Sequence, residues 1–211
     1  MSTVTTPATP PTPASVPHRY YLAQSTFRKF TLDEYHKLIE HGVFMDGEPY
    51  ELLEGNLVHK MSRGTPHDVS LDLLEEALSR VLPPPWYPRS QKALTLAESE
   101  PEPDVAVVPG PRRRYGSAHP TPAEARLVIE VSDSSLLIDR HDKGSIYARA
   151  GIPVYWVVNV VDKLIEVYTL PSGLDETAAY TKRDDYPVGT TVPVVLDGNA
   201  VGSIAVSEVF S

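Results

Sequence analysis

The spacing of apolar residues along the chain predicts a first helix that begins at Thr31. The segment Thr-Leu-Asp-Glu is a capping box, in which the Thr31 side chain caps the helix while Glu34 reaches back to its start. An apolar stripe follows at helical spacing and consists of Leu32, Tyr35, Leu38 and Ile39. Gly42 is the expected end of the helix, because glycine readily adopts the left-handed conformation that closes many helices.

The same reasoning predicts two further helices. Thr65 and Pro66 fit the N-cap and first position of a helix that Pro83-Pro84-Pro85 ends. Its core-facing stripe consists of Val69, Leu73, Leu74, Ala77, Leu78, Val81 and Leu82. A third helix is expected over residues 139–150, where Gly151 closes it.

Short apolar runs between these helices predict β-strands. Residues 50–60 read as two strands hinged at Gly55-Asn56. Runs at 154–159 and 163–169 predict a hairpin, with Trp156 in the core. The remaining strands are expected near 93–97, at 104–108, at 127–132 and as several short runs toward Ser211.

The order of these elements predicts an α/β domain with a central mixed β-sheet flanked by α-helices. We assign residues 19–211 to this single domain, since no internal repeat or second domain is evident. Residues 1–18 are rich in Pro and Thr and lack periodic apolar positions, so a disordered tail is expected there.

Composition excludes several classes of protein. With 211 residues, 41% hydrophobic and 22% charged, the chain suits one globular domain. The absence of cysteine excludes disulfides, thiolate zinc sites and a cysteine nucleophile. No apolar run approaches the ~20 residues of a membrane span, and the N-terminus lacks a signal pattern. We therefore expect a soluble, cytoplasmic protein with no membrane partner.

The formal net charge of −9 argues against a protein that coats nucleic acid by charge alone. It is compatible with a nuclease whose acidic pocket takes up a cation before phosphate approaches. Contact with DNA would then depend on local basic residues, for which the candidates are Lys60 with Arg63, Arg112 to Arg114, and Arg140 with Arg149. The alternative interpretation is that these are scattered solvated charges.

Two acids on predicted strands are the main candidates for chemistry. Glu130 lies within the apolar run 127–132, where an ionised carboxylate is costly to bury unless a cation or a donor compensates it. Asp104 begins another apolar run, and Lys143 lies one loop beyond Glu130. Mg²⁺ prefers carboxylate oxygens and activates water for phosphodiester hydrolysis. Acids on paired strands beside a lysine therefore indicate a metal-dependent phosphodiesterase.

Four segments, taken in order, resemble a known family: YELLEGNLV at 50–58, PEPDVAVV at 101–108, LVIEVSDSSLLIDRHDK at 127–143 and YARAGIPVYWVVN at 147–159. They are similar to the Uma-two family of putative restriction endonucleases, a domain of unknown function in the PD-(D/E)XK nuclease superfamily. The resemblance covers roughly residues 30–170 and extends to SEVF at 207–210. It implies a restriction-endonuclease-like core with acids on the central strands.

The resemblance also implies roles for individual residues. Asp104 and Glu130 match the two acids of the superfamily motif and would bind Mg²⁺, for which Mn²⁺ could substitute. The superfamily lysine would stand at position 132, where this chain has Ser132. Lys143 matches a lysine displaced to the following helix, from which it could orient the attacking water or stabilise charge on the phosphate. Glu51 matches an upstream acid and would complete the metal shell directly or through water.

Several of these assignments have alternatives. Glu54 rivals Glu51, because alternation puts the two on opposite strand faces. Lys143 could instead pair with Asp139, one helical turn away. The backbone carbonyl of Val131 is a conceivable further metal ligand.

Two other residues near the motifs are ambiguous. His67 stands at a helix start and also resembles the family, but a histidine there more often caps the helix or lies at the surface. Tyr147 follows Lys143 by one turn and is expected to pack in the core.

Three functions are compatible with these residues. The first is a Mg²⁺-dependent DNA endonuclease, expected to act as a homodimer because paired cuts need two sites. It predicts that Asp104, Glu130 and Lys143 converge within the distances of a metal shell. The alternative is a nuclease-like binding module without catalysis, which Ser132 and the acidic charge favour. A glycosidase with two carboxylates is the weakest, because the sequence offers no aromatic platform for a sugar.

Overall fold

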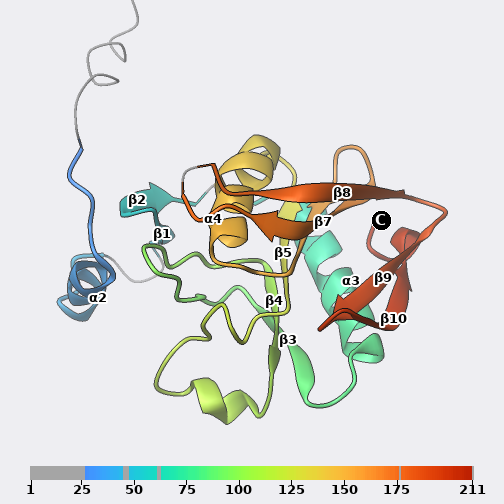
Figure 1. Ribbon diagram of the computed structural model, residues 1–211, viewed down its shortest axis with the longest axis horizontal. Coiled ribbons are helices and arrows are strands. Elements are labelled where there is room, and N and C mark those ends of the chain that lie inside the picture. Colours follow the sequence, from blue (N-terminus) through green and yellow to red (C-terminus); the bar gives the residue numbers. More distant parts are fainter. Residues whose placement is uncertain (1–26, 45–47, 61–62, 176, 211) are drawn as a thin grey trace, which may run out of the picture.

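The computed structural model describes residues 27–44, 48–60, 63–175 and 177–210. Its largest element is a sheet of six strands, namely β3 (Trp86–Ser90), β4 (Val105–Pro109), β5 (Leu127–Ser132), β6 (Val154–Asn159), β7 (Leu164–Ser172) and β8 (Ala179–Pro187). The strands are neighbours in the order β3-β4-β5-β6-β7-β8 (Figure 1). β5 and β6 are parallel, and every other neighbouring pair in this sheet is antiparallel. This mixed sheet with flanking helices confirms the predicted fold class.

Smaller elements complete the fold. Two hairpins form sheets of their own: β1 (Tyr50–Leu53) with β2 (Asn56–His59), and β9 (Thr191–Leu196) with β10 (Asn199–Ala205). The helical elements are α2 (Leu32–Glu40), the 3-10 turn η1 (Arg112–Tyr115), α3 (Thr65–Val81), the π-helical turn η2 (Ile138–Lys143), α4 (Gly144–Arg149) and the 3-10 turn η3 (Val206–Glu208). None of the described helices is both long and apolar enough to cross a membrane. The predicted disordered tail, 1–18, lies outside the described residues.

The central sheet is covered on both faces. α3 and the β9–β10 hairpin lie against one face, while α4 lies against the other (Figure 1). Alternation along β5 sends Leu127, Ile129 and Val131 into the core on the α3 face and Val128 into the core on the α4 face. Glu130 shares the parity of Val128, so its carboxylate lies on the α4 face of a strand that is buried throughout.

Helix α2 forms where the sequence predicts it. The Thr31 side chain accepts a hydrogen bond from the N–H of Glu34, and the Glu34 carboxylate accepts one from the N–H of Thr31. These two bonds satisfy donors that the first helical turn leaves free. The helix ends at Glu40, and Gly42 follows with a φ of 64°.

Helix α3 differs from its prediction in two details. The N-cap is Gly64, because Thr65 is already the first helical residue. The buried face also differs from the predicted stripe, since Val69 is 41% exposed whereas Leu71 is buried. The buried face of the helix is therefore shifted from the predicted stripe and includes His67, Ser70 and Leu71.

The strand expected near 93–97 is absent, and β3 forms earlier in the chain instead. The N–H groups of Leu94 and Leu96 bond to the carbonyls of Pro101 and Ser99, in a loop rather than in a ladder. Both side chains are buried, which explains the apolar pattern without a strand. β3 contains Pro88 and lies at an edge of the sheet, where proline is tolerated.

The turn between β1 and β2 lies one residue earlier than predicted. Glu54 and Gly55 have φ values of 49° and 76°, and Asn56 already belongs to β2. A Cβ at Gly55 would lie 2.7 Å from Cβ of Lys29, so glycine is required here by packing as well as by conformation. This turn fixes the register in which Glu51 opposes Val58.

We expect Leu74→Ala to lower the free energy of unfolding by about 2–5 kcal/mol, because Leu74 is fully buried between α3 and the sheet. Urea titration followed by circular dichroism measures this change. Val69→Ala on the same helix is the control and should change stability by less than about 0.5 kcal/mol. Equal losses in the two variants would contradict the assigned packing face.

Candidate active site

All four predicted site residues line one cavity. Glu51 from β1, Asp104 from the residue before β4, Glu130 from β5 and Lys143 from η2 surround a space of about 70 Å³. Each of these side chains is at least nine-tenths buried, with residue exposures between 3% and 8%. Residues separated by up to 92 positions in the chain thus share one polar space. The sheet topology brings them together.

Asp104 is held by the strand pairing of β4 and β5. Val105 pairs with Ile129, which places Asp104 beside Glu130 at the same end of the two strands. The Asp104 carboxylate accepts a hydrogen bond of 2.8 Å from the N–H of Val131. The two acids therefore face the same side of the sheet, as the metal hypothesis requires.

His67, near the start of α3, contacts Asp104 directly. Its Nε2 lies 3.1 Å from Oδ2 of Asp104, and both side chains are buried. Burial acts to raise the pKa of Asp104, but the hydrogen bond and charge of His67, the Val131 N–H and Arg63 hold that pKa below its ordinary value. Burial acts to lower the pKa of His67, and its bond to Asp104 more than offsets this. The result is a charge-assisted pair in the wall of the cavity.

Lys143 is the counter-ion of the other two acids. Its Nζ donates a 3.1 Å hydrogen bond to Oε1 of Glu130 and lies 3.4 Å from Oε1 of Glu51. The hydroxyl of Tyr147 donates a further bond of 2.7 Å to Oε1 of Glu130. The alternative prediction, in which Lys143 pairs with Asp139 on the helix surface, is wrong. The Lys143 ammonium points inward and contacts Glu130 instead.

The electrostatics of this group follow from burial. Burial raises the pKa of Glu130 to about 8, with the charge of Lys143 opposing the shift and the other acids adding to it. Burial acts to lower the pKa of Lys143, but the charges of Glu130, Glu51 and Asp139 outweigh it, so the pKa lies above its usual value. Lys143 is thus a permanent cation beside a carboxyl group that readily holds a proton.

A π-helical turn delivers Lys143 to the cavity. The N–H of Gly144 bonds to the carbonyl of Asp139 five residues earlier, and the hydroxyl of Tyr155 donates to the same carbonyl at 2.9 Å. π-helical turns occur mostly as single interruptions of helices, frequently at functional sites. On its outer side, Arg140 forms bonds through Nε of 3.1 and 3.0 Å to both carboxylate oxygens of Glu166, which is fully buried on β7. This ion pair ties the turn to the sheet.

Ser132 supports a further acid. Its hydroxyl donates a 2.6 Å hydrogen bond to Asp139, which also accepts one from Ser135. Asp139 is 3% exposed, lines the cavity and has a pKa raised by burial. Ser132, at the position where the resemblance implied a lysine, thus orients an acid of the cavity wall.

The structure also places the other residues singled out near the motifs, Glu54, Tyr147 and Trp156. Glu54 lies outside the cavity and pairs with Arg149 at 2.7 Å, so Glu51 is the acid that faces the site. Tyr147 is fully buried, as expected for a core residue, and also contacts Glu130. Trp156 is fully buried in the core, as predicted.

Sequence reasoning missed three acids that line the cavity, Glu102, Asp133 and Asp139, and undervalued the histidine. The sequence suggested Asp139 only as a partner for Lys143. The spacing of four residues places both side chains on one helical face, which could have indicated that Asp139 also faces the site. His67 was expected to cap a helix or lie at the surface, and the structure corrects this because the side chain is 6% exposed and bound to Asp104. Its bond spans 37 positions, which local pattern does not reveal.

The donor chemistry of the cavity fits Mg²⁺, since its candidate ligands are carboxylate oxygens. Within the described residues, however, no three Asp, Glu or His side chains lie close enough together to hold a metal ion. Lys143 Nζ stands between Glu51 and Glu130, and His67 and Arg63 lie against Asp104. An ion bound among these acids would therefore compete with Lys143 for their charge.

The mixed sheet, with acids at the ends of adjacent strands, has the fold of restriction-endonuclease-like nucleases. The chain belongs to the Uma2 family, described as "Putative restriction endonuclease", whose family model matches residues 32–198. The solved structure of "a putative nuclease belonging to DUF820" from Anabaena variabilis is similar, with a TM-score of 0.61 and 16% identity over 86% of this chain and 97% of that one. At this identity the likeness concerns the fold alone. No curated protein matches the chain.

The raised pKa of Glu130 predicts a pH dependence of stability. Between its ordinary value of 4.5 and its folded value of about 8, the folded state binds more protons than the unfolded state, so the free energy of unfolding falls as the pH rises. Glu130→Gln should remove up to about 1.4 kcal/mol per pH unit of this slope. Urea titrations at pH 5 to 8 in EDTA measure it, with Glu208→Gln as an exposed control. Parallel slopes for Glu130→Gln and the unmodified protein would contradict the shift.

Proposed function

We propose that the protein is a Mg²⁺-dependent endonuclease that hydrolyses phosphodiester bonds of DNA. The observation that carries the proposal is the convergence of Asp104, Glu130 and Lys143 on one polar cavity. Membership of a family described as putative restriction endonucleases supports the same class of reaction. Mn²⁺ is expected to substitute for Mg²⁺, because both take oxygen ligands.

Asp104, Glu130 and Glu51 are the proposed metal ligands, and the carbonyl of Val131 is a further candidate. When bound, Mg²⁺ would neutralise phosphate charge and lower the pKa of a coordinated water. Glu51 is held for this role by the N–H of Glu102, which donates to its Oε2 at 3.1 Å. The opposite carboxylate oxygen faces Lys143.

Lys143 is the proposed displaced catalytic lysine. Its ammonium is charged across the neutral pH range, since its pKa is raised. On displacement from Glu51 and Glu130 it would contact the attacking water or a phosphate oxygen, and stabilise negative charge that develops there. The buried, low-dielectric setting strengthens that interaction.

Cations at the rim of the cavity would receive the substrate. Lys60 is ion-paired with Glu102, and Arg63 lies 3.7 Å from Asp104. Both line the cavity and carry the positive charge that a phosphodiester needs next to the acids of the cavity wall. His67 would act by holding Asp104 in one orientation.

A second candidate function is a binding module without catalysis. Two observations favour it: Ser132 occupies the place of the superfamily lysine, and the described residues contain no ready-made group of three metal donors. Against it, Lys143 is buried and directed at Glu130 rather than at solvent. The endonuclease is therefore the function that the geometry supports best.

We expect Asp104→Asn to abolish DNA cleavage, and Lys143→Met to slow it about 10²–10³-fold. Asparagine keeps the shape of Asp104 while removing the charge that would bind a metal ion, and methionine keeps the apolar stem of Lys143 without its ammonium. A plasmid-nicking assay with Mg²⁺ or Mn²⁺ measures both effects. Calorimetric titration with Mn²⁺ tests ion binding separately.

Asp184→Asn and Lys182→Met are matched controls on the exposed edge strand β8, where the two side chains pair with each other. Both should cleave as the unmodified protein does. Thermal denaturation must show that all four variants fold. Full cleavage by Asp104→Asn would rule out the proposed site, whereas DNA binding without cleavage or Mn²⁺ uptake would establish the binding module.

We also propose that two copies of the chain act together, because cutting both strands of a duplex needs two sites. Sedimentation equilibrium at micromolar concentration should then give the mass of two chains, with or without a duplex oligonucleotide. A single-chain mass under both conditions would contradict the homodimer.

A further inference from the structure

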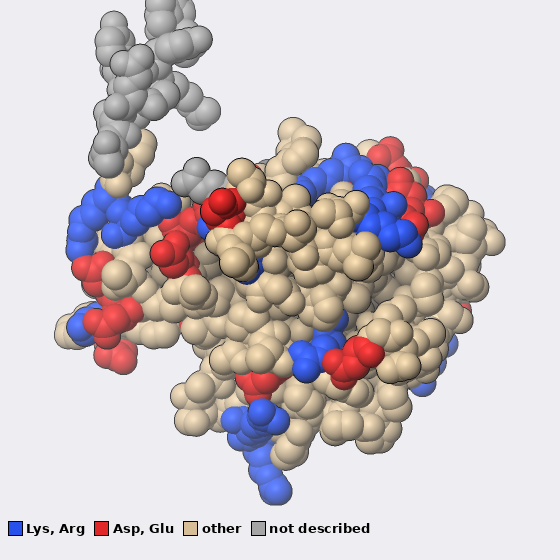
Figure 2. All heavy atoms as spheres, viewed as in Figure 1, with Lys and Arg blue, Asp and Glu red and all other residues tan. Residues whose placement is uncertain are grey.

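A second polar cavity lies at the outer edge of the central sheet. It is about 280 Å³ in volume and shares no lining residue with the candidate active site. Arg89 and Ser90 of the edge strand β3, Lys92 beyond it and Arg112 of η1 contribute to its wall. Basic side chains project from this end of the molecule (Figure 2), where the η1 turn lies at the bottom of Figure 1.

Arg89 is a buried cation without a counter-ion. It is 7% exposed; Nη1 donates to the carbonyl of Ala93 at 2.7 Å, and Nη2 lies 3.0 Å from Nδ1 of His119. No carboxylate of the described chain lies within ion-pair distance of its guanidinium. Burial lowers the pKa of Arg89, and Tyr87, Tyr115 and Glu102 oppose this only in part. A buried guanidinium with neutral acceptors alone is electrostatically unsatisfied.

Two exposed cations adjoin it, and neither is paired with a described acid. The guanidinium of Arg112 lies over the Tyr87 ring at 4.8 Å, an arrangement that orients it and leaves its N–H edge free. Lys92 Nζ donates only to the carbonyl of Ser90, at 3.2 Å. Glu75 of α3 is the one acid in the wall of this cavity, so three cations face a single carboxylate. Such an excess is notable in a chain with a net charge of −9.

The Arg89 and Arg112 side chains lie on the same face of β3, because Arg89 alternates in step with Tyr87, on whose ring Arg112 lies. Guanidinium and ammonium groups both donate to phosphate oxygens, so Arg89, Lys92 and Arg112 provide the donors that a phosphate group requires.

We propose that Arg89, Lys92 and Arg112 form a second anion site, which binds a backbone phosphate of nucleic acid outside the catalytic cavity. The proposal rests on the proposed function for the class of ligand. Arg89 opposes Ala106 in the β3–β4 pairing, two residues beyond Asp104. A nucleic-acid strand that enters the active site therefore lies within reach of this second site, where a phosphate contact would fix its direction.

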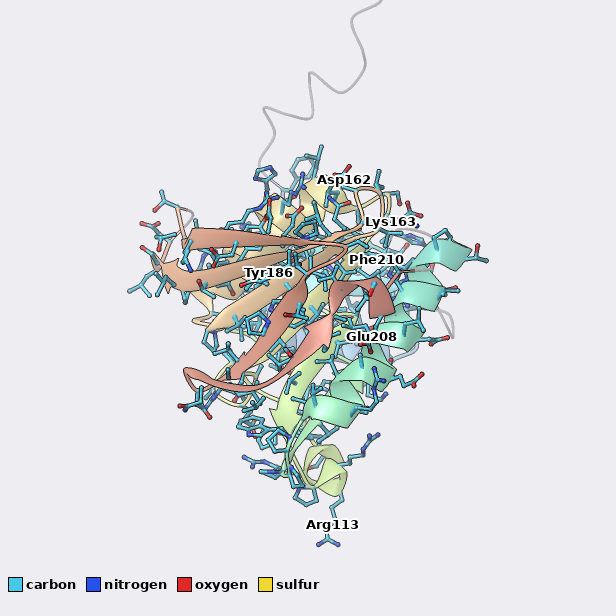
Figure 3. The ribbon with its side chains drawn as sticks, turned by 90° about the vertical axis from the view of Figure 1, so that its right-hand side faces the viewer. Arg113, Asp162, Lys163, Tyr186, Glu208 and Phe210 are labelled. Atoms are coloured by element: carbon cyan, nitrogen blue, oxygen red, sulfur yellow. The ribbon has the colours of Figure 1, made fainter. Side chains whose placement is uncertain are left out.

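The test uses Lys92→Ala/Arg112→Ala, which leaves the buried Arg89 in place so that the fold is preserved. Binding of a fluorescent 20-base-pair duplex in Ca²⁺ is followed by anisotropy between 50 and 200 mM salt. The double variant should bind about tenfold more weakly at the lower salt, and the slope of log K against log salt should become shallower by about two. The control is Lys37→Ala/Arg113→Ala, which changes the net charge by the same amount. Arg113 does not line the cavity, and its side chain projects outward from the end of the molecule (Figure 3). An equal loss in the control, or an unchanged slope in the test variant, would overturn the proposal.

A second arm titrates the unmodified protein with inorganic phosphate in a calorimeter. Weak or absent binding at millimolar phosphate, together with the expected duplex result, supports a nucleic-acid site. Tight binding of inorganic phosphate with unchanged duplex affinity in Lys92→Ala/Arg112→Ala would mean a site for free phosphate and would overturn the proposal.

The outcomes separate this inference from the proposed function. If the unmodified protein binds duplex through Lys92 and Arg112 but never cleaves it with Mg²⁺ or Mn²⁺, the endonuclease proposal fails and the second site stands. If it cleaves DNA while the double variant retains its full affinity and salt slope, the second site fails and the endonuclease proposal stands. Failure of the unmodified protein to bind duplex at all overturns the second site.

Discussion

The burial of several carboxylates around one lysine is the constraint on which the site depends. Glu51 and Glu130 come from different sheets, and the Lys143 ammonium lies between them as the counter-ion of both. Burial also makes Glu130 a group that readily takes a proton, which relieves repulsion among the acids. When no other cation is present, Lys143 therefore stabilises the fold by compensating the charge of the buried acids. The proposed catalytic role needs the lysine in this same position. If the proposed Mg²⁺ bound there, Glu51 and Glu130 would hold it, and Lys143 would be free to contact the substrate.

The position of that lysine is set by contacts with β6 and β7 on the α4 face of the sheet. The η2 turn is wound more widely than an α-helix, and Tyr155 and Gly144 share the carbonyl that this winding exposes. Arg140 then ties the turn to Glu166, which is also bonded to Tyr168 and approached by Arg183. Each polar group in this network is satisfied, so the turn has one well-defined arrangement. The strand β7 thus helps to position the turn that carries Lys143 into the cavity.

The charge distribution is compatible with the proposed phosphate substrate of an acidic chain. Acids occupy the deepest positions, while Lys60 and Arg63 lie at the rim of the candidate site and a separate group of cations lies along the β3 edge. Local fields of this kind, rather than the net charge, decide where a polyanion can approach. Of the basic residues singled out from sequence, Arg140 and Arg149 are instead engaged within the protein, with Glu166 and Glu54 respectively. Only the folded structure separates these two groups of cations.

The sequence alone determined the α/β class, the ends of α2, the β6–β7 hairpin and the acids Asp104 and Glu130 with Lys143, because caps, periodicity and short motifs act over a few neighbouring residues. It did not locate β3, whose Pro88 suits an edge strand only once the sheet exists, and it placed a strand where Leu94 and Leu96 fill the core instead. The contact of His67 with Asp104, the inward turn of Asp139 and the unpaired burial of Arg89 were decided by tertiary structure. Each depends on groups brought together from distant parts of the chain, and the free energy of burying a charge is set by those neighbours rather than by local pattern.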